Sequence, residues 1–135
     1  WQYILEPLSG YLWLGALLMK DASKYSEAWN FGPRDESFLT VGQVAQNIIN
    51  IWGSGSIKVK KEKYHEMNLL KLDISKATSY LNWRPIFGID KTIENTVNWY
   101  NEYYSNKTNM FDFSIEQIMD YEKEAKINDL LWSKR

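Results

Sequence analysis

The sequence contains no cysteine and only one histidine among its 135 residues. The lack of cysteine excludes disulfides, thiolate catalysis and cysteine-ligated zinc, and a lone histidine without clustered carboxylates offers little to a transition metal. Long hydrophobic runs are also scarce. The most apolar stretch, residues 12–19, is too short to cross a bilayer at about 1.5 Å per residue, and no basic segment precedes an apolar one at the start. We expect no metal site, no membrane partner and a reducing, cytoplasmic location.

Charge of one sign is likewise missing, since 16 basic and 17 acidic residues leave a net charge of -1. A phosphate backbone attracts a basic stripe, so nucleic acid is not an expected partner. The chain suffices for one core, but it is short for a dinucleotide-using enzyme, which needs a nucleotide lobe and a substrate lobe. It also opens on Trp-Gln-Tyr-Ile-Leu-Glu-Pro without a methionine. These features predict a piece of a longer protein.

Apolar spacing predicts a helix over residues 5–19 with almost no polar face, which needs cover on both sides. A capping box at Thr40 and Gln43 predicts a second helix that ends near residue 52, before Gly53-Ser54-Gly55-Ser56. A short helix capped by Ser75 should stop before Pro85, because proline cannot continue it.

The clearest amphipathic helix is predicted over residues 90–104, followed by a polar linker. A further helix, capped by Ser114, is predicted to run to about residue 131. Short strands are expected at residues 28–31, 57–60 and 70–73. The predicted organisation is a main portion over residues 1–104 and a linker with a tail helix over residues 105–135.

Several segments in order resemble one enzyme family: Leu5-Glu6-Pro7-Leu8-Ser9-Gly10-Tyr11-Leu12, Glu27-Ala28-Trp29-Asn30-Phe31-Gly32-Pro33, His65-Glu66, Leu69-Leu70-Lys71-Leu72-Asp73, Ser75-Lys76-Ala77 and Leu81-Asn82-Trp83-Arg84-Pro85. Over residues 1–104 the sequence resembles the CDP-glucose 4,6-dehydratases, which are extended short-chain dehydrogenases/reductases. The resemblance implies an α/β fold class, here the C-terminal substrate-binding portion, with mainly helices, a few short strands and no dinucleotide-binding core.

The resemblance also implies a reaction. The family oxidises the sugar at C4 with bound NAD, eliminates water across C5 and C6 and returns the hydride to C6, on the way to dideoxysugars of bacterial surface lipopolysaccharide. The glycine fingerprint that lets backbone amides approach a pyrophosphate is absent here, and Gly53-Ser54-Gly55-Ser56 has the wrong spacing. The family's Tyr-x-x-x-Lys belongs to the other half. The copy from Tyr103 to Lys107 is interpreted as a core tyrosine and a lysine near a helix end. We expect no catalytic and no cofactor-binding residue in this chain.

Four residues are candidates for substrate binding: Trp1, Gln2, His65 and Glu66. The resemblance places His65 and Glu66 where relatives hold the ribose and phosphates; an imidazole can donate to phosphate and a carboxylate can accept from ribose hydroxyls. The alternative is a solvated charged loop. Trp1 and Gln2 correspond to a segment near the sugar nucleotide, or else form a frayed terminus. Arg34 is interpreted as a surface arginine rather than a diphosphate ligand.

The expected ligand is a CDP-sugar. Self-association is also expected, because a helix that is apolar on all sides would expose one face once the nucleotide lobe is missing. Two alternatives stay open: a non-catalytic binding or interaction module derived from this lobe, and a fragment of a related NDP-sugar epimerase or dehydratase.

Overall fold

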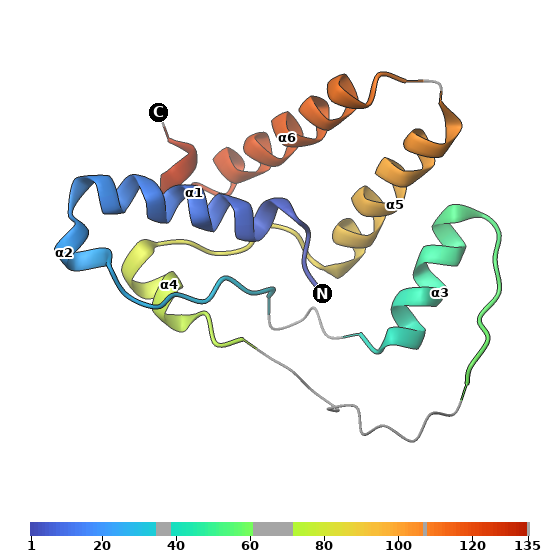
Figure 1. Cartoon of the computed structure of the whole chain (residues 1–135), viewed down its shortest axis with the longest axis horizontal. Helices are drawn as coiled ribbons and strands as arrows, with labels where there is room; N and C mark the ends of the chain where they lie inside the picture. The colour runs from blue at the N-terminus through green and yellow to red at the C-terminus, as the bar shows by residue number, and fades with distance from the viewer. Residues whose placement is uncertain (35–38, 61–71, 107, 135) are drawn as a thin grey trace.

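The structure is a computed structural model that describes residues 1–34, 39–60, 72–106 and 108–134. Those residues form six α-helices and one 3₁₀ turn (Figure 1). The helices are α1 (Leu5–Lys20), α2 (Ala22–Tyr25), α3 (Val41–Trp52), α4 (Ser75–Leu81), α5 (Ile89–Ser105) and α6 (Met110–Ile127), and the turn η1 spans Leu131–Ser133. The expectation of a mainly helical chain is confirmed.

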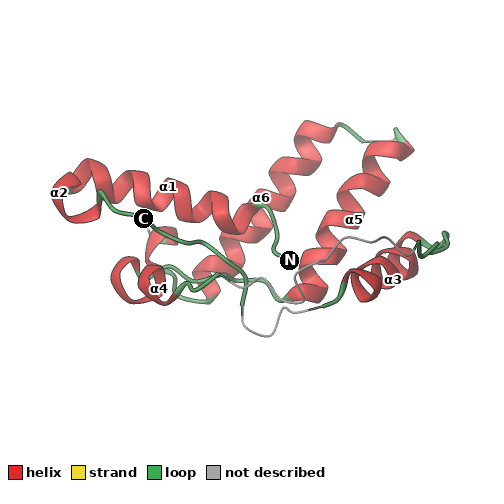
Figure 2. Ribbon diagram, turned by 60° about the horizontal axis from the view of Figure 1, so that its bottom comes forward, coloured by secondary structure: helices red, strands yellow, loops and turns green. Residues whose placement is uncertain are grey.

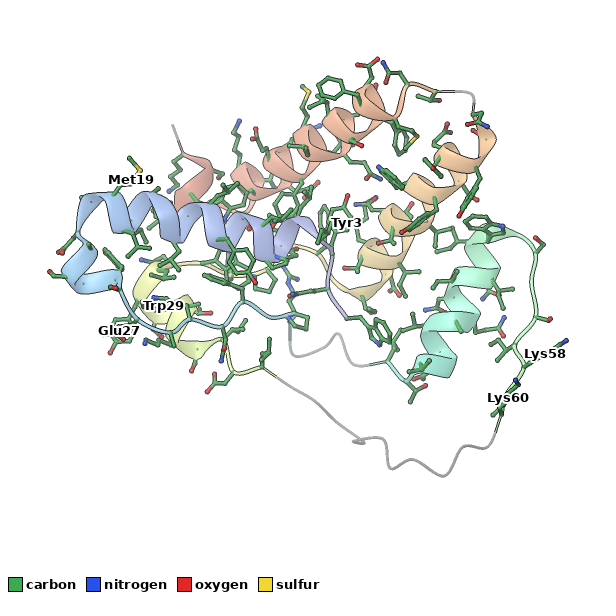
Figure 3. All side chains as sticks on the ribbon, in the orientation of Figure 1. Tyr3, Met19, Glu27, Trp29, Lys58 and Lys60 are labelled. Atoms are coloured by element: carbon green, nitrogen blue, oxygen red, sulfur yellow. The ribbon has the colours of Figure 1, made fainter. Side chains whose placement is uncertain are left out.

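Helix α1 agrees with the predicted range of residues 5–19 and extends it by one residue. One side packs onto the core, where Trp13, Leu14 and Leu17 contact a buried cluster. The opposite side is open in the described structure: Leu12 is 76% exposed and Met19 is 91% exposed. Figure 3 shows Met19 projecting from the helix away from its neighbours. The helix is therefore covered on one side only.

The capping box predicted for α3 is present. The Thr40 hydroxyl accepts a hydrogen bond from the Gln43 backbone N–H at 3.2 Å, and the Thr40 N–H donates to the Gln43 side chain at 2.9 Å. At the other end Gly53 has φ +86°, a left-handed conformation that glycine adopts without strain. Helix α3 then packs on α5 through a small buried cluster of Val44, Ile93 and Val97.

The caps predicted for α4 and α6 are wrong. Asp73, rather than Ser75, accepts the first N–H of α4, since its Oδ1 lies 2.8 Å from the Ser75 nitrogen. Helix α6 begins four residues before Ser114, because the Asn109 side chain caps it by accepting from the Phe111 N–H at 3.0 Å. Ser114 lies inside α6, where its hydroxyl donates to the Met110 carbonyl oxygen at 2.7 Å.

The short strands expected at residues 28–31 and 57–60 are also wrong, since the described residues contain helices and loops only (Figure 2). Both segments are extended, but a strand needs a neighbouring backbone to pair with. Residues 28–31 run beside residues 72–74 and are joined to them by a side chain: the Asn30 amide donates to the Asp73 carbonyl oxygen at 3.2 Å. Part of the third predicted strand, residues 70–71, lies outside the described residues.

Two buried clusters form the main core. The first gathers Tyr3, Ile86, Phe87, Tyr121, Ala125 and Leu130, and the second gathers Phe31, Ala77, Leu81 and Trp83. Trp132 packs against both. Helix α6 meets α1 through Tyr121, whose hydroxyl contacts Glu6 and Ser9 and whose ring lies in the same cluster as Tyr3. The boundary between residues 104 and 105 stays a prediction, and the helix beyond it contributes directly to this core.

Candidate functional site

The first two residues are fixed to the body of the protein. The Trp1 indole N–H donates to the Leu39 carbonyl oxygen at 3.1 Å, while the residue stays 55% exposed. The Gln2 side-chain amide donates to the Phe31 carbonyl oxygen at 3.4 Å. Both partners lie about thirty or more residues along the chain, so the structure does not support the alternative of a frayed terminus. An anchored ring that is half open to solvent is suited to contact with a ligand.

Gln2 lines a cavity of about 520 Å³ between the N-terminal segment, α5 and α6. The lining consists of Gln2, Tyr3, Ile4, Leu5, Pro7, Asn95, Thr96, Trp99, Tyr100, Ser114, Gln117 and Ile118. Internal bonds use several of the polar groups: the Tyr3 hydroxyl donates to the Gln117 side chain at 2.9 Å, and the Gln117 amide donates to the Asn95 carbonyl oxygen at 2.9 Å. The Gln2 side-chain oxygen is buried with no partner among the described residues.

The chemistry of this cavity limits what it can hold. Its volume falls within the range of small-molecule sites, about 300–1,000 Å³. However, neither carboxylate nor cationic side chain lines it. A diphosphate is bound by arginine, lysine or a helix N-terminus, so the cavity suits uncharged rings rather than a pyrophosphate.

The other two candidate residues, His65 and Glu66, lie outside the described residues. Lys58 and Lys60 stand on the extended segment that leads towards them from α3 (Figure 3). Arg34 is partly buried, and its Nε donates to the Pro85 carbonyl oxygen at 3.3 Å. This contact gives Arg34 a role in holding the chain near Pro85, where the sequence suggested only a surface position.

Sequence reasoning missed a buried polar network in the Leu-Glu-Pro-Leu-Ser-Gly-Tyr segment. Glu6 is 1% exposed, and its Oε1 accepts from the backbone N–H groups of Ile86 at 2.9 Å and Phe87 at 2.7 Å. Its Oε2 lies 2.7 Å from the Tyr121 hydroxyl. Burial raises the pKa of Glu6, an effect that the hydrogen bonds from the Phe87 backbone, the Tyr121 hydroxyl and the Ile86 backbone partly offset. Burial also raises the pKa of Tyr121, with Glu6 adding to the effect.

Ser9 extends this network. Its hydroxyl lies 3.1 Å from that of Tyr121, and it accepts from the Trp83 indole N–H at 3.0 Å. The signal in the sequence was a glutamate and a serine three residues apart within an otherwise apolar helix. Such residues are buried only when their polar groups are paired, so the segment joins α1, α6 and the residues around Trp83.

The glycine-rich segment after α3 does not have the geometry of a dinucleotide-binding turn. Gly53-Ser54-Gly55-Ser56 ends α3 and leads into an extended segment, whereas a pyrophosphate cradle opens a helix whose free N–H groups point at the anion. Tyr103 is half exposed and stacks on Trp99 with ring centroids 5.5 Å apart. Lys107 lies outside the described residues.

Among the described residues, no three histidine or carboxylate side chains gather as metal ligands would. In the same part of the chain, every helix is too short or too polar to span a membrane.

Comparison with known proteins places the chain beside the enzymes that dehydrate sugar nucleotides. The chain is 39% identical over 123 residues to the CDP-glucose 4,6-dehydratase of Salmonella typhimurium (strain LT2). The alignment covers 90% of this chain and 34% of that protein, so the chain spans about a third of the relative's length. No protein-family model matches the chain. The resemblance seen in the sequence is therefore confirmed, extends beyond residues 1–104, and agrees with a C-terminal portion of such an enzyme.

Proposed function

We propose that this chain is the sugar-nucleotide-binding portion of a CDP-glucose 4,6-dehydratase. The observation that carries the proposal is the 39% identity over nine-tenths of the chain. The whole protein would convert CDP-glucose to CDP-4-keto-6-deoxyglucose with NAD, and its product would feed dideoxysugar synthesis. The cytoplasm is the proposed location, on the basis of the cysteine-free composition.

By itself the chain would bind substrate without turning it over. Hydride transfer needs a bound dinucleotide, and the glycine-rich segment Gly53-Ser54-Gly55-Ser56 ends α3 rather than opening a helix. The cofactor and the catalytic residues would be supplied by a nucleotide lobe, as the resemblance implies. The chain's own contribution would be to hold the nucleotide end of the substrate.

Two pairs of residues carry this role in the proposal. Trp1 would present its half-exposed ring to the nucleoside, while its indole N–H stays bonded to Leu39. Gln2 would position that segment through Phe31. His65 and Glu66 would bind phosphate and ribose hydroxyls by donating and accepting hydrogen bonds.

The test is a calorimetric titration of the chain with CDP-glucose and CDP. We expect binding that weakens at least tenfold, equivalent to about 1.4 kcal/mol, in Trp1→Ala and in the double variant His65→Ala with Glu66→Ala. Glu116→Gln, an exposed change on α6, serves as the control and should leave affinity unchanged.

Two results would contradict the proposal. The absence of heat of binding at millimolar ligand would favour the non-catalytic module. Formation of the 4-keto-6-deoxy product by this chain with NAD would contradict the proposal that the catalytic residues lie in a separate nucleotide lobe. An affinity for another NDP-sugar above that for CDP-glucose would instead indicate a related epimerase or dehydratase.

A further inference from the structure

The network around Glu6 contains a closed chain of three oxygen-to-oxygen contacts. Glu6 Oε2 lies 2.7 Å from the Tyr121 hydroxyl, which lies 3.1 Å from the Ser9 hydroxyl. The Ser9 hydroxyl lies in turn 2.7 Å from the backbone carbonyl oxygen of Glu6. Each contact requires one hydrogen between its two oxygens.

The position of each hydrogen follows step by step from the one oxygen that cannot donate. The Glu6 carbonyl oxygen is an acceptor only, so Ser9 must donate its single hydroxyl hydrogen to it. Ser9 then has none left for Tyr121, so a hydrogen bond between the two hydroxyls requires Tyr121 to donate to Ser9. If Tyr121 donates to Glu6 Oε2 instead, its contact with Ser9 holds no hydrogen. All three contacts are hydrogen bonds only when the carboxyl group supplies the hydrogen to Tyr121.

The remaining contacts agree with a neutral carboxylic acid. Oε1 accepts from the backbone N–H groups of Ile86 and Phe87, as the carbonyl oxygen of an acid would. The Trp83 indole N–H donates to Ser9, whose hydroxyl keeps an acceptor position for it. A carboxylate would leave these three contacts one hydrogen short. It would also bury a negative charge, because Glu6 is only 1% exposed to solvent.

Other titratable or charged groups near Glu6 in the described structure come from three elements. Tyr121 on α6 is in direct contact, and Tyr3 in the N-terminal segment acts on Tyr121. Arg34, in the loop after Gly32, favours the charged form of Glu6 electrostatically. Its effect on the Glu6 pKa is smaller than that of burial, and its Nε donates to the Pro85 carbonyl oxygen.

We propose that Glu6 keeps its proton in the folded chain and acts as a pH-sensitive latch, holding α1, α6 and residues 85–87 together until the proton is lost to solvent. Deprotonation removes the hydrogen between Glu6 and Tyr121, or else breaks one of the two Ser9 contacts. It also leaves a buried negative charge for which Arg34 is the one opposite charge nearby among the described residues.

The sign of the pH dependence follows from proton linkage. The folded chain binds one proton that the unfolded chain releases near the ordinary carboxyl pKa of 4.5. Stability is then complete below that pH and declines above it. The contribution of Glu6 to the unfolding equilibrium constant should rise about tenfold per pH unit, until Glu6 ionises in the folded chain. A carboxylate stabilised by its hydrogen bonds would give the opposite slope.

The test compares the natural chain with Glu6→Gln by urea unfolding across pH. A glutamine copies the neutral acid, because its carbonyl oxygen can accept from Ile86 and Phe87 while its amide donates to Tyr121. Glu6→Gln should lose the tenfold-per-unit dependence and unfold at higher urea than the natural chain above neutral pH. The matched control, Glu116→Gln, changes an exposed α6 residue and should keep the natural slope.

Two further measurements detect the carboxyl proton directly. Infrared difference spectra between the natural chain and Glu6→Gln should show a protonated-carboxyl carbonyl band at neutral pH. If Glu6→Gln fails to fold, carboxyl ¹³C shifts of the natural chain report the same proton. Carboxylate signals at every position near pH 6, or a Glu6→Gln chain that is less stable than the natural one at all pH values, would overturn the proposal.

Discussion

At the scale of single residues, the two glycines of α1 differ in whether a side chain would fit. A Cβ atom added to Gly10 would lie 2.3 Å from Cδ1 of Phe31, which packs edge-on against Trp83 in the second cluster. Gly15, five residues along the same helix, has no atom within 4 Å of such a Cβ. The two glycines therefore differ in function although the sequence presents them alike.

Alanine substitutions should separate these two glycines. Gly15→Ala should stabilise the chain by up to about 1 kcal/mol, because alanine favours the helix more than glycine does and its Cβ meets no atom there. Gly10→Ala should destabilise it by about 1 kcal/mol or more, since Phe31 must move out of a packed cluster and the helix gain offsets only part of that cost. Urea unfolding of both variants measures the difference. Equal stabilisation by the two alanines would contradict the close contact.

Trp83 illustrates the same scale from the side of a large residue. Its ring is completely buried, and its N–H donates to Ser9. The sequence does not identify the bond to Ser9, because the two residues lie 74 positions apart.

At the scale of elements, the helix ends show which local signals are decisive. The Thr40–Gln43 box works because both of its bonds lie within four residues. Ser75 and Ser114 were predicted to cap their helices, but Asp73 and Asn109 accept the first free N–H groups there. A side chain that lies nearer the helix start and can accept from a free N–H takes the capping position.

Removal of the α3 cap gives a prediction at this scale. Thr40→Ala should lower the free energy of unfolding by about 1 kcal/mol, since the helix loses an N–H acceptor at its start. Thr40→Ser keeps the acceptor and should change stability much less. Hydrogen exchange should speed up first in the early turns of α3, which is held to α5 through Val44, Ile93 and Val97. Unchanged unfolding in Thr40→Ala would show that packing on α5 alone fixes this helix.

At the scale of the whole molecule, the exposed side of α1 is the main unexplained surface. Its large apolar residues share one face of the helix and stand open to solvent: Ile4, Leu8, Tyr11, Leu12 and Met19. Exposed apolar stripes of this kind favour association. Self-association of the chain stays a prediction, with this stripe as its proposed contact.

Light scattering across a concentration series tests that prediction. The natural chain should show a mass that rises with concentration, and Leu12→Glu or Met19→Glu should shift it towards the monomer because a buried charge opposes the contact. Lys58→Glu, on the extended segment after α3, is the control and should behave as the natural chain does. A monomeric mass at every concentration would remove the expectation.

The sequence by itself determined the mainly helical architecture, the ranges of α1 and α5 to within a residue or so and the α3 capping box, because these depend on residues within one or two turns of each other. It also carried the resemblance to the dehydratases. Only the tertiary structure decided that residues 28–31 and 57–60 stay unpaired, that Trp1 and Gln2 are anchored, and that Glu6 meets Tyr121 across 115 positions. Pairing, burial and proton position depend on groups that are distant in the chain, and no local pattern specifies which of them will meet.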